Sequence, residues 1–330
     1  MKRNRVFIIA ELSANHNNDL DIALETVRAA AKSGADAIKV QTYKASSLAL
    51  DVDNEYFGPK KEGLWKGIRP YDLYADAALP YEWHNILKQE AEKEGLIFFS
   101  SPFDLEGVDF LEELGVSIYK IASFEITDIP LIRYTASKGK PMIISTGVAN
   151  EEDIMLALDT CYEVNNYDVT LLKCTSQYPA VVADANLATI RDMEKRFNVE
   201  IGLSDHTMGY VVPMAATALG AKVIEKHFIL DRKLGGADST FSMEPAEFKE
   251  MVDNVRLVEE SLGKVKYTIT ESDKYKRRSL FAVEDIQIGE VFSNNNVKSL
   301  RPGVGLHPKK LQSLLGTKSK LSFKKGDPLK

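Results

Sequence analysis

Short runs of consecutive apolar residues recur along most of the chain, and stretches with apolar residues at helical spacing separate them. Continuous apolar runs are typical of parallel strands, because helices cover such strands on both faces. The pattern predicts eight strands, at residues 5–12, 36–42, 96–102, 117–123, 141–147, 169–175, 199–205 and 222–228. Helices are predicted between them, for example at 19–33, and a last helix is predicted at 245–262.

A glycine ends the helical segment before five of these strands, at positions 34, 95, 115, 139 and 220. Glycine tolerates the left-handed backbone conformation with which many helices end. Each of these glycines therefore marks the step from a helix to the next strand of a repeating βα unit. Eight such units in roughly 265 residues have the size of a (β/α)8 TIM barrel. We predict this α/β fold for residues 1–263.

The character of the chain changes after this predicted barrel. Residues 264–278 are polar and charged and predict a linker. Short β-type pieces such as L-F-A-V-E-D-I follow, so residues 279–330 are expected to form a small second domain.

Composition narrows the functional classes. The chain has 330 residues, of which 44% are hydrophobic and 27% charged, as in an ordinary globular protein. A formal net charge of −6 argues against a general nucleic-acid surface, so local lysines or arginines must bind any anionic ligand. Only two cysteines are present, which favours a reducing cytosol over a disulfide framework. No apolar run has the length of a membrane span, and no membrane partner is expected.

Polar residues gather where the predicted strands end, which is where TIM barrels carry their active sites. Lys39 and Lys120 lie within otherwise apolar strands and would be costly to bury without an anion. Small hydroxyls follow on other strands, at Ser101, Ser123, Ser145 and Ser204. Lysines with hydroxyls favour a phosphate or carboxylate ligand. Glu11 is either part of this site or a structural partner of Lys39.

Two histidines, His206 and His227, end neighbouring predicted strands. As a pair they suggest an open metal site that water or substrate completes. Cys174 has no histidine near it in sequence and is expected to be an inert, packed thiol. His84 is expected on the surface of a helix. The long connection at 43–80 is either a lid or wall over the ligand or a surface excursion.

Many ordered motifs resemble the sialic acid (nonulosonic acid) synthase family. They are I-I-A-E-L-S-A-N-H (8–16), I-K-V-Q-T-Y (38–43), F-S-S-P-F-D (99–104), Y-K-I-A-S-F-E (119–125), L-L-K-C-T-S-Q-Y-P (171–179), G-L-S-D-H-T (202–207) and I-E-K-H-F (224–228). That family condenses phosphoenolpyruvate with an amino-sugar aldose. The segments D-N-E-Y-F (53–57) and A-D-S-T-F-S (237–242) are most similar to members that use a diacetamido-trideoxy altrose. Ala237 departs from the proline that is usual there.

The resemblance implies a role for each matching residue. Phosphoenolpyruvate would be bound by Lys39, Ser101, Lys120, Ser123, Ser145 and Ser204. A divalent metal, Mn²⁺ by family habit with Mg²⁺ or Co²⁺ as alternatives, would bind His206 and His227, with Glu225 as a buttress. The sugar would contact Gln41, Tyr178 and Asp238. Glu11, Glu125 and Lys120 would be the catalytic residues.

The second domain resembles the antifreeze-like (SAF) module at the C-terminus of these synthases. The resemblance implies a domain-swapped homodimer in which Arg301, in R-P-G, reaches the sugar bound by the partner subunit.

Three alternatives stay open. Synthases of the same family for N-acetylneuraminic or legionaminic acid differ only in the sugar. A metal-dependent aldolase or lyase on the same barrel would use pyruvate and release no phosphate. A saccharide-binding or ice-binding role of residues 279–330 alone would leave the barrel as a scaffold.

Overall fold

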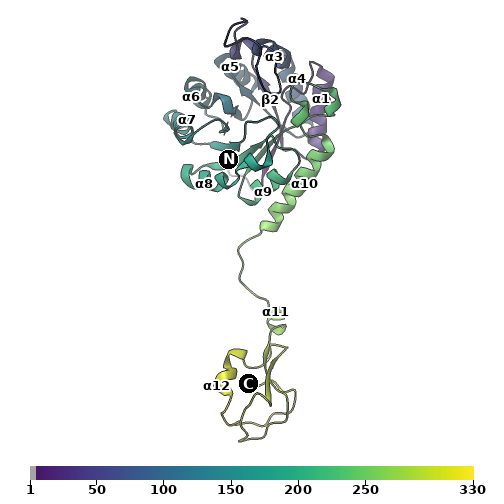
Figure 1. Cartoon of the computed structure of the whole chain (residues 1–330), viewed down its shortest axis with the longest axis vertical. Coiled ribbons are helices and arrows are strands. Elements are labelled where there is room, and N and C mark those ends of the chain that lie inside the picture. The colour runs from purple at the N-terminus through teal and green to yellow at the C-terminus, as the bar shows by residue number, and fades with distance from the viewer. Residues whose placement is uncertain (1–4) are drawn as a thin grey trace. The chain divides into compact units, whose positions relative to one another are not determined.

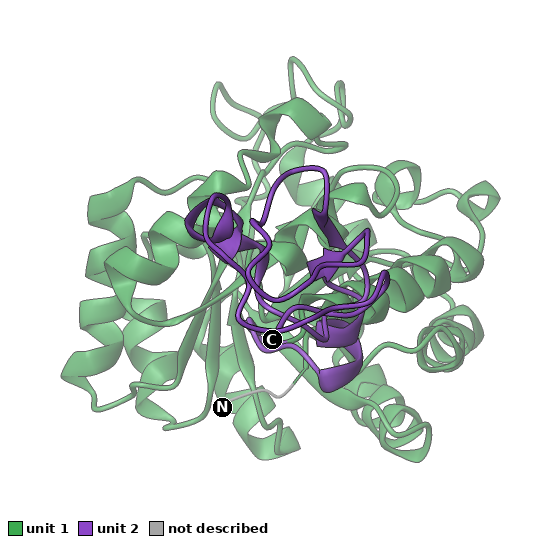
Figure 2. Cartoon of the chain, turned by 90° about the horizontal axis from the view of Figure 1, so that it is seen from below, with its two compact units in different colours: residues 1–263 green, residues 264–330 purple. Residues whose placement is uncertain are grey.

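The computed structural model describes residues 5–330 of the chain. The chain divides into two compact units, residues 1–263 and residues 264–330, which Figure 2 shows in different colours. Within residues 5–330, no helix combines the length and the apolar character that crossing a membrane requires.

Unit 1 is a closed barrel of parallel strands whose order follows the sequence (Figure 1). Strand β1 pairs with both β2 and β8, and this pairing closes the barrel. The eight strands are β1 (Phe7–Glu11), β2 (Ala37–Thr42), β3 (Ile97–Pro102), β4 (Tyr119–Ile121), β5 (Met142–Ser145), β6 (Val169–Cys174), β7 (Glu200–Asp205) and β8 (Val223–His227). The predicted (β/α)8 barrel is therefore confirmed, and every predicted strand is found.

Helices surround the barrel (Figure 1). They are α1 (Leu20–Lys32), α2 (Ala45–Leu48), α3 (Pro70–Ala77), α4 (Tyr81–Lys93), α5 (Leu105–Leu114), α6 (Ile129–Ser137), α7 (Glu151–Glu163), α8 (Ala188–Phe197), α9 (Val211–Ala218) and α10 (Pro245–Leu262). All five glycines predicted to end helices have positive φ, at 87°, 79°, 75°, 70° and 108° in chain order. Glycine adopts this backbone conformation without strain. The prediction that these glycines end the helices before the strands is therefore confirmed.

Two apolar layers hold unit 1 together. The larger lies between strands and helices and includes Ile8, Val27 and Val255. The smaller fills the barrel and comprises Phe7, Ile9, Ala37, Phe99, Ile118, Ile143, Leu172 and Val223. The same strands supply both layers because successive side chains of a strand point to opposite faces.

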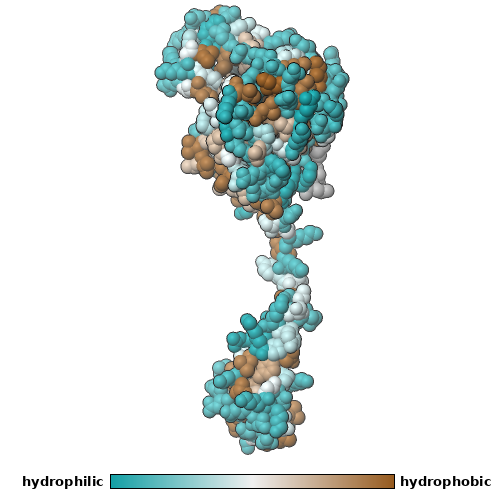
Figure 3. Space-filling view, turned by 90° about the vertical axis from the view of Figure 1, so that its right-hand side faces the viewer, coloured by the Kyte–Doolittle hydropathy of each residue, from teal (hydrophilic) through white to brown (hydrophobic). Residues whose placement is uncertain are grey.

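Unit 2 has its own small core. Its strands β9 (Ser279–Ala282) and β10 (Val297–Leu300) pair antiparallel. The core comprises Leu280, Ala282, Ile286, Phe292, Val297 and Leu329. The face of this unit seen in Figure 3 is largely hydrophilic, with hydrophobic residues scattered over it. Its helices are α11 (Glu271–Tyr275) and α12 (Leu311–Leu314). Helix α11 lies in the segment predicted as a linker, where Thr270 and Asp273 form a capping box.

Candidate active site

A polar layer lies directly beyond the apolar layer inside the barrel. In β1 the inward side chains Phe7 and Ile9 are followed, two residues on, by Glu11, and in β2 Ala37 is followed by Lys39. The same alternation turns further polar or thiol side chains into the barrel, at Ser101, Lys120, Ser145, Cys174, Ser204 and Glu225. Strand periodicity thus brings the predicted residues to one end of the barrel.

Lys39 is buried and lies between two carboxylates. Its Nζ is 2.6 Å from Oε2 of Glu11 and 3.9 Å from Oε1 of Glu225, and it donates to Oγ of Ser101 at 3.4 Å. Burial would lower the pKa of Lys39, but the two carboxylates outweigh it and raise that pKa. Burial raises the pKa of Glu11 to about 7, although Lys39 opposes this. Glu11 is therefore an ion-pair partner of Lys39, as one interpretation of the sequence expects.

Lys120 approaches the second carboxylate from the other side. Its Nζ lies 3.8 Å from Oε1 of Glu225 and donates to the carbonyl of Ile121 at 3.1 Å. Burial lowers the pKa of Lys120. For Glu225 burial is outweighed by Lys120 and Lys39, which lower its pKa and keep it ionised. The amines of Lys39 and Lys120 thus share the ionised carboxylate of Glu225. Lys39 also pairs with Glu11, whose pKa is about 7. When Glu11 is protonated, one positive charge of the cluster has no carboxylate to balance it, and an anionic ligand would supply the balance.

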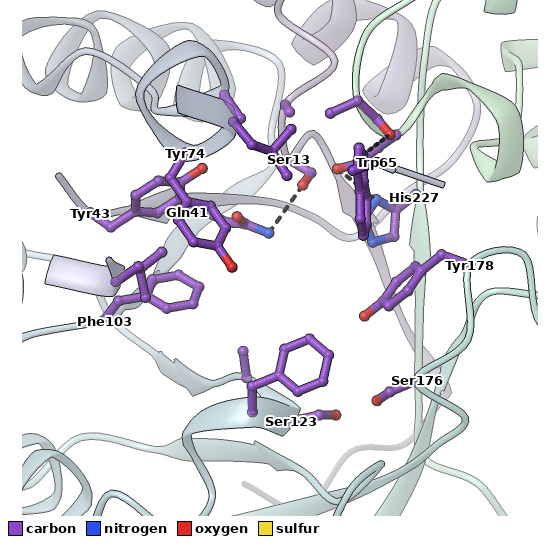
Figure 4. Close-up of a pocket in the computed structure, with 18 of the residues that line it drawn as sticks. Ser13, Gln41, Tyr43, Trp65, Tyr74, Phe103, Ser123, Ser176, Tyr178 and His227 are labelled. Carbon is purple, nitrogen blue, oxygen red and sulfur yellow. Dashed lines mark hydrogen bonds and ion pairs between the residues drawn. The ribbon is translucent and has the colours of Figure 1, made fainter. Parts of the chain in front are cut away.

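A cavity of about 550 Å³ opens beside this cluster (Figure 4). Gln41 joins the two, because its Nε2 donates to Oε1 of Glu11 at 3.1 Å and to Oγ of Ser13 at 3.0 Å. Ser13 lines the cavity as well. The predicted site residues that line the cavity are Gln41, Ser123, Glu125, Tyr178, His227 and Asp238. The predicted phosphate-binding residues other than Ser123 lie in the polar layer of the barrel.

The short 3-10 helix η1 (Ser123–Glu125) brings the predicted residues Ser123 and Glu125 to the wall of this cavity. Ser123 Oγ accepts a hydrogen bond from the amide of Gly147 at 3.2 Å. A Cβ at Gly147 would lie 2.1 Å from Oγ of Ser176, so only glycine leaves room for this hydroxyl. Burial raises the pKa of Glu125 to about 7, although Lys120 opposes this.

Several buried polar atoms of the site make no hydrogen bond within the described part of the chain. They include Oε2 of Glu125, Oγ of Ser145, Oε2 of Glu225 and Nδ1 of His227. Buried polar atoms are nearly always hydrogen-bonded in proteins, and leaving one unpaired costs about 1–3 kcal/mol. Their concentration around one cavity is typical of a site that is completed by a ligand.

The histidine pair is suited to a divalent metal. The rings of His206 and His227 lie 5.3 Å apart between centroids. Nδ1 of His206 donates to the carbonyl of Thr175 at 3.0 Å, so Nε2 is the nitrogen left for a ligand. Burial would lower the pKa of His206, but Cys174 and Thr175 outweigh it and raise that pKa, so a metal would have to displace a proton there. Burial holds the pKa of His227 well below its usual value, so its imidazole is neutral, as metal binding requires. Across residues 5–330, no set of three or more His, Cys, Asp or Glu side chains is grouped for a metal. A site with the two histidines as its protein ligands would be open, with water or substrate to complete it.

Cys174 differs from the inert thiol that the sequence suggests. Its Sγ lies 4.0 Å from Nδ1 of His206, a residue 32 positions away in sequence. Burial would raise the pKa of Cys174, but the contact with His206 outweighs it and lowers that pKa to about 7. The thiol is packed, as the sequence suggests, and the contact with His206 is the feature that the sequence does not reveal. The pairing of β6 with β7 brings Cys174 close to His206, which follows β7 directly. The distance between the two residues in sequence gives no sign of this contact.

The loop after β8 and the connection at 43–80 close the cavity. Burial raises the pKa of Asp238, although hydrogen bonds from Ser13 and from the Ala14 amide oppose this. Trp65 Nε1 donates to the carbonyl of Ala237 at 3.2 Å, next to Asp238. The connection at 43–80 therefore forms a wall of the cavity. The residues that it contributes are Tyr43, Leu48, Lys60, Trp65, Leu73, Tyr74 and Ala77.

Two histidines outside the pair are structural. His84 is buried on α4, where its ring contacts Oγ1 of Thr42 at 2.8 Å and the carbonyl of Pro80 at 3.1 Å. The prediction of a surface position for His84 is wrong, because the inner face of α4 meets a polar side chain of β2. His16 is also fully buried, and its Nε2 bonds the carbonyl of Ala77 at 3.2 Å.

Arg301 is an exposed residue of unit 2 and follows β10 directly. The cavity residues that sequence reasoning does not single out include Ser13, Lys60, Leu73 and Phe103. Ser13 could have been found from the sequence, because it lies two residues after Glu11 at the end of a strand. The others lie on loops or helices whose orientation only the fold determines.

Comparisons with known proteins agree with this geometry. A model of the NeuB family matches residues 26–267, and a model of the SAF domain matches residues 277–330. The pseudaminic acid synthase of Campylobacter jejuni subsp. jejuni serotype O:2 is 50% identical over 329 residues, which cover 99% of this chain and 96% of the relative. The pseudaminic acid synthase of Helicobacter pylori is 45% identical over 326 residues, which cover 98% of this chain and 96% of the relative.

A crystal structure of N-acetylneuraminic acid (sialic acid) synthetase from Leptospira borgpetersenii serovar Hardjo-bovis is similar as well. Its TM-score is 0.73 at 36% sequence identity, over 82% of this chain and 89% of that chain. The resemblance predicted from the motifs is therefore confirmed. The chain belongs to the NeuB family, as an enzyme that carries a C-terminal SAF domain.

Proposed function

We propose that the protein condenses phosphoenolpyruvate with 2,4-diacetamido-2,4,6-trideoxy-L-altrose to give pseudaminic acid and phosphate. The observation that carries the condensing chemistry is the buried pair Lys39 and Lys120 beside the cavity, which share Glu225 at 3.9 Å and 3.8 Å. The choice of sugar rests on the two pseudaminic acid synthases that match nearly the whole chain.

Phosphoenolpyruvate would occupy the polar layer of the barrel. Lys39 and Lys120 supply the positive charge, and hydroxyls of Ser101, Ser123, Ser145 and Ser204 supply hydrogen bonds. The unpartnered Oγ of Ser145 supports this role, because an acceptor oxygen of the ligand would satisfy it. The enol carbon then faces the cavity, where Gln41, Tyr178 and Asp238 would hold the sugar.

His206 and His227 would hold the divalent metal, for which we propose Mn²⁺. When bound, this ion supplies Lewis acidity that makes the sugar aldehyde more electrophilic. Glu225 is buried beside the proposed metal site, where burial would raise its pKa but Lys120, Lys39 and His206 outweigh this and keep it ionised. Metal-ligating histidines are commonly oriented by such neighbouring groups, as Thr175 orients His206 here.

The reaction would proceed by attack of the enol carbon on the aldehyde carbon. The aldehyde oxygen takes up one proton to become a hydroxyl, and the water that adds in the next step gives one proton back. The pyruvyl carbon that is left electron-poor takes up water, and Glu11 or Glu125 accepts the water proton. Both carboxyls titrate near pH 7, where a group can accept and return a proton. The tetrahedral phosphate adduct collapses by cleavage of its C–O bond, and Lys39 and Lys120 stabilise the departing phosphate.

The SAF domain would complete the site in a domain-swapped homodimer, with Arg301 contacting the sugar bound by the other subunit. The two unpaired thiols, Cys161 and Cys174, support a reducing cytoplasm as the compartment. Mixing Arg301→Ala chains with Lys120→Ala chains tests the swap. Recovered activity is expected, because one of the two sites in each mixed dimer then has an intact Lys120 from one chain and an intact Arg301 from the other. No recovery would contradict the swap.

Phosphate release from phosphoenolpyruvate tests the function. We expect release to be faster with the diacetamido-trideoxy altrose than with N-acetylmannosamine or with the precursor of legionaminic acid. A faster rate with either of the latter would reassign the sugar within the family. Condensation of pyruvate, with no phosphate formed from phosphoenolpyruvate, would indicate the aldolase instead.

A further inference from the structure

The cavity has two chemically different sides. Figure 4 shows His227 and Tyr178 on one side and Tyr43, Tyr74 and Phe103 on the opposite side. The first side carries the reacting groups, because His227 belongs to the histidine pair and Asp238 lies 3.7 Å from it. The second side, which we call the aromatic wall, comprises Tyr43, Leu48, Leu73, Tyr74 and Phe103.

The aromatic wall is built as a packed unit. The ring of Tyr43 contacts Phe103 edge-on at 5.2 Å and Tyr74 edge-on at 6.2 Å between centroids. Leu48 ends α2 and Leu73 lies on α3, two helices that contact each other. Both helices belong to the connection at 43–80, so the wall is an addition to the barrel and not part of its strands. Edge-on aromatic contacts restrict the rings and give the wall a defined shape.

The wall offers no hydrogen-bond partner to a hydroxyl group of a ligand at Leu48, Leu73 and Phe103. It contains no charged and no amide side chain, and its only side-chain polar atoms are the hydroxyls of Tyr43 and Tyr74. A sugar hydroxyl placed against Leu48 or Leu73 would lose its water without gaining a partner. A methyl group placed there would instead gain by the removal of apolar area from water.

The position of the wall determines which part of the sugar meets it. If His227 holds the proposed metal, the aldehyde lies on the side of His227 and Tyr178, opposite the aromatic wall (Figure 4). An open-chain six-carbon sugar extends away from its aldehyde, so its far carbon points to the opposite side of the cavity.

We propose that the aromatic wall selects a sugar whose end farthest from the aldehyde is a methyl group, with Leu48 and Leu73 as the specificity-determining contacts. This inference rests on the proposed condensation of a 6-deoxy sugar and assigns the residues that recognise its deoxy end. An apolar contact with one small group of the substrate changes kcat/KM by about 10-fold to 200-fold between substrates that differ in that group.

The test compares two sugars that differ by one oxygen atom, 2,4-diacetamido-2,4,6-trideoxy-L-altrose and its 6-hydroxy analogue. The measured quantity is the ratio of their kcat/KM values in phosphate release from phosphoenolpyruvate. We expect the wild type to prefer the deoxy sugar at least 10-fold. Leu73→Asn and Leu48→Asn, which keep the side-chain size, should each lower this preference several-fold, and Leu73→Met should retain it.

Controls separate the outcomes. Leu257→Asn changes an exposed leucine of α10 and should leave the ratio unchanged. KM for phosphoenolpyruvate should also stay unchanged in the wall variants, which shows that the barrel is intact. A wild type active on the deoxy sugar, with the same ratio in wild type, Leu48→Asn and Leu73→Asn, would overturn this inference alone. A wild type inactive on both sugars would overturn the proposed function and the inference with it.

Discussion

Lys39 and Glu11 form a buried ion pair, with Nζ of Lys39 2.6 Å from Oε2 of Glu11 and side-chain exposures of 4% and 1%. A buried pair of this kind stabilises a fold little, because the desolvation of both charges offsets their attraction. Its value here is functional, since it holds an ammonium group ready beside the cavity. The pair also determines how the protein should respond when one partner is removed.

Lys39→Met should raise KM for phosphoenolpyruvate at least 10-fold, because one of the two cations proposed to bind the anion is lost. Breaking a buried pair usually costs about 3–5 kcal/mol. Here the loss of stability should be smaller at pH 6 than at pH 9, since Glu11 has a pKa of about 7 even beside Lys39 and can become neutral. Denaturant titrations at both pH values measure this difference.

The matched control is Lys249→Met, which removes a surface pair with Asp253 whose side chains are 57% and 58% exposed. Exposed pairs contribute about 0–1 kcal/mol, so this variant should behave like the wild type at both pH values. An equal loss of stability at pH 6 and pH 9 in Lys39→Met would contradict the account of Glu11.

Glu125→Gln should be more stable than the wild type at high pH. Burial raises the folded-state pKa of Glu125 from 4.5 to about 7, so the folded protein holds this proton more tightly than the unfolded chain. The stability that this proton provides is complete below about pH 4.5 and is lost as pH rises through 7. The variant escapes this loss and should gain up to about 3 kcal/mol over the wild type between pH 5 and pH 8.5.

Unfolding free energies of Glu125→Gln and wild type at the two pH values provide the measurement. The same variant should lose about 100-fold in kcat, because it cannot accept the water proton. Parallel stability curves in the two proteins would show that Glu125 does not titrate near neutrality.

His227→Ala should abolish metal binding, because the neutral imidazole of His227 is one of two protein ligands in the proposed site. Electron paramagnetic resonance of added Mn²⁺ measures the bound ion directly, independently of turnover. The exposed His307 of unit 2 gives the control, and His307→Ala should bind Mn²⁺ as the wild type does. Undiminished Mn²⁺ binding by His227→Ala, or full activity of the wild type in excess chelator, would exclude the proposed metal site.

Trp65→Phe should raise KM for the sugar about 3-fold to 10-fold, since it removes a hydrogen bond worth about 0.5–1.5 kcal/mol to the carbonyl of Ala237. KM for phosphoenolpyruvate should not change, because Trp65 lines the cavity proposed for the sugar and does not belong to the polar layer of the barrel. The chain has one other tryptophan, Trp83, which packs against His16 and does not line the cavity. Trp83→Phe should leave both KM values unaltered, and an equal effect of the two substitutions would remove Trp65 from the sugar site.

The barrel could be predicted from sequence because its periodicities are local. Apolar runs gave the strands, and glycines such as Gly115, with φ of 75°, gave the helix ends. The polar layer followed from the same alternation, which is why Lys39 and Lys120 could be placed at one end before the fold was known. A residue two positions beyond an inward apolar side chain points inward as well.

Contacts between distant segments could not be predicted in this way. Cys174 and His206 are 32 positions apart, and only the pairing of β6 with β7 brings them to 4.0 Å. His84 has the polar surroundings of a surface helix in sequence, yet α4 turns it onto Thr42. Leu73 belongs to the aromatic wall through the course of a long connection, and Phe103 through the loop that follows β3, and no local pattern specifies either course.

The most direct test of the central claim follows the bridging oxygen of phosphoenolpyruvate. Phosphoenolpyruvate labelled with ¹⁸O at this position is incubated with the protein, Mn²⁺ and the diacetamido-trideoxy altrose, and both products are weighed by mass spectrometry. The account predicts a nine-carbon acid without label and one equivalent of phosphate that carries the ¹⁸O, because the C–O bond breaks. Label retained in the nine-carbon product, with unlabelled phosphate, would mean that the P–O bond breaks and would contradict it.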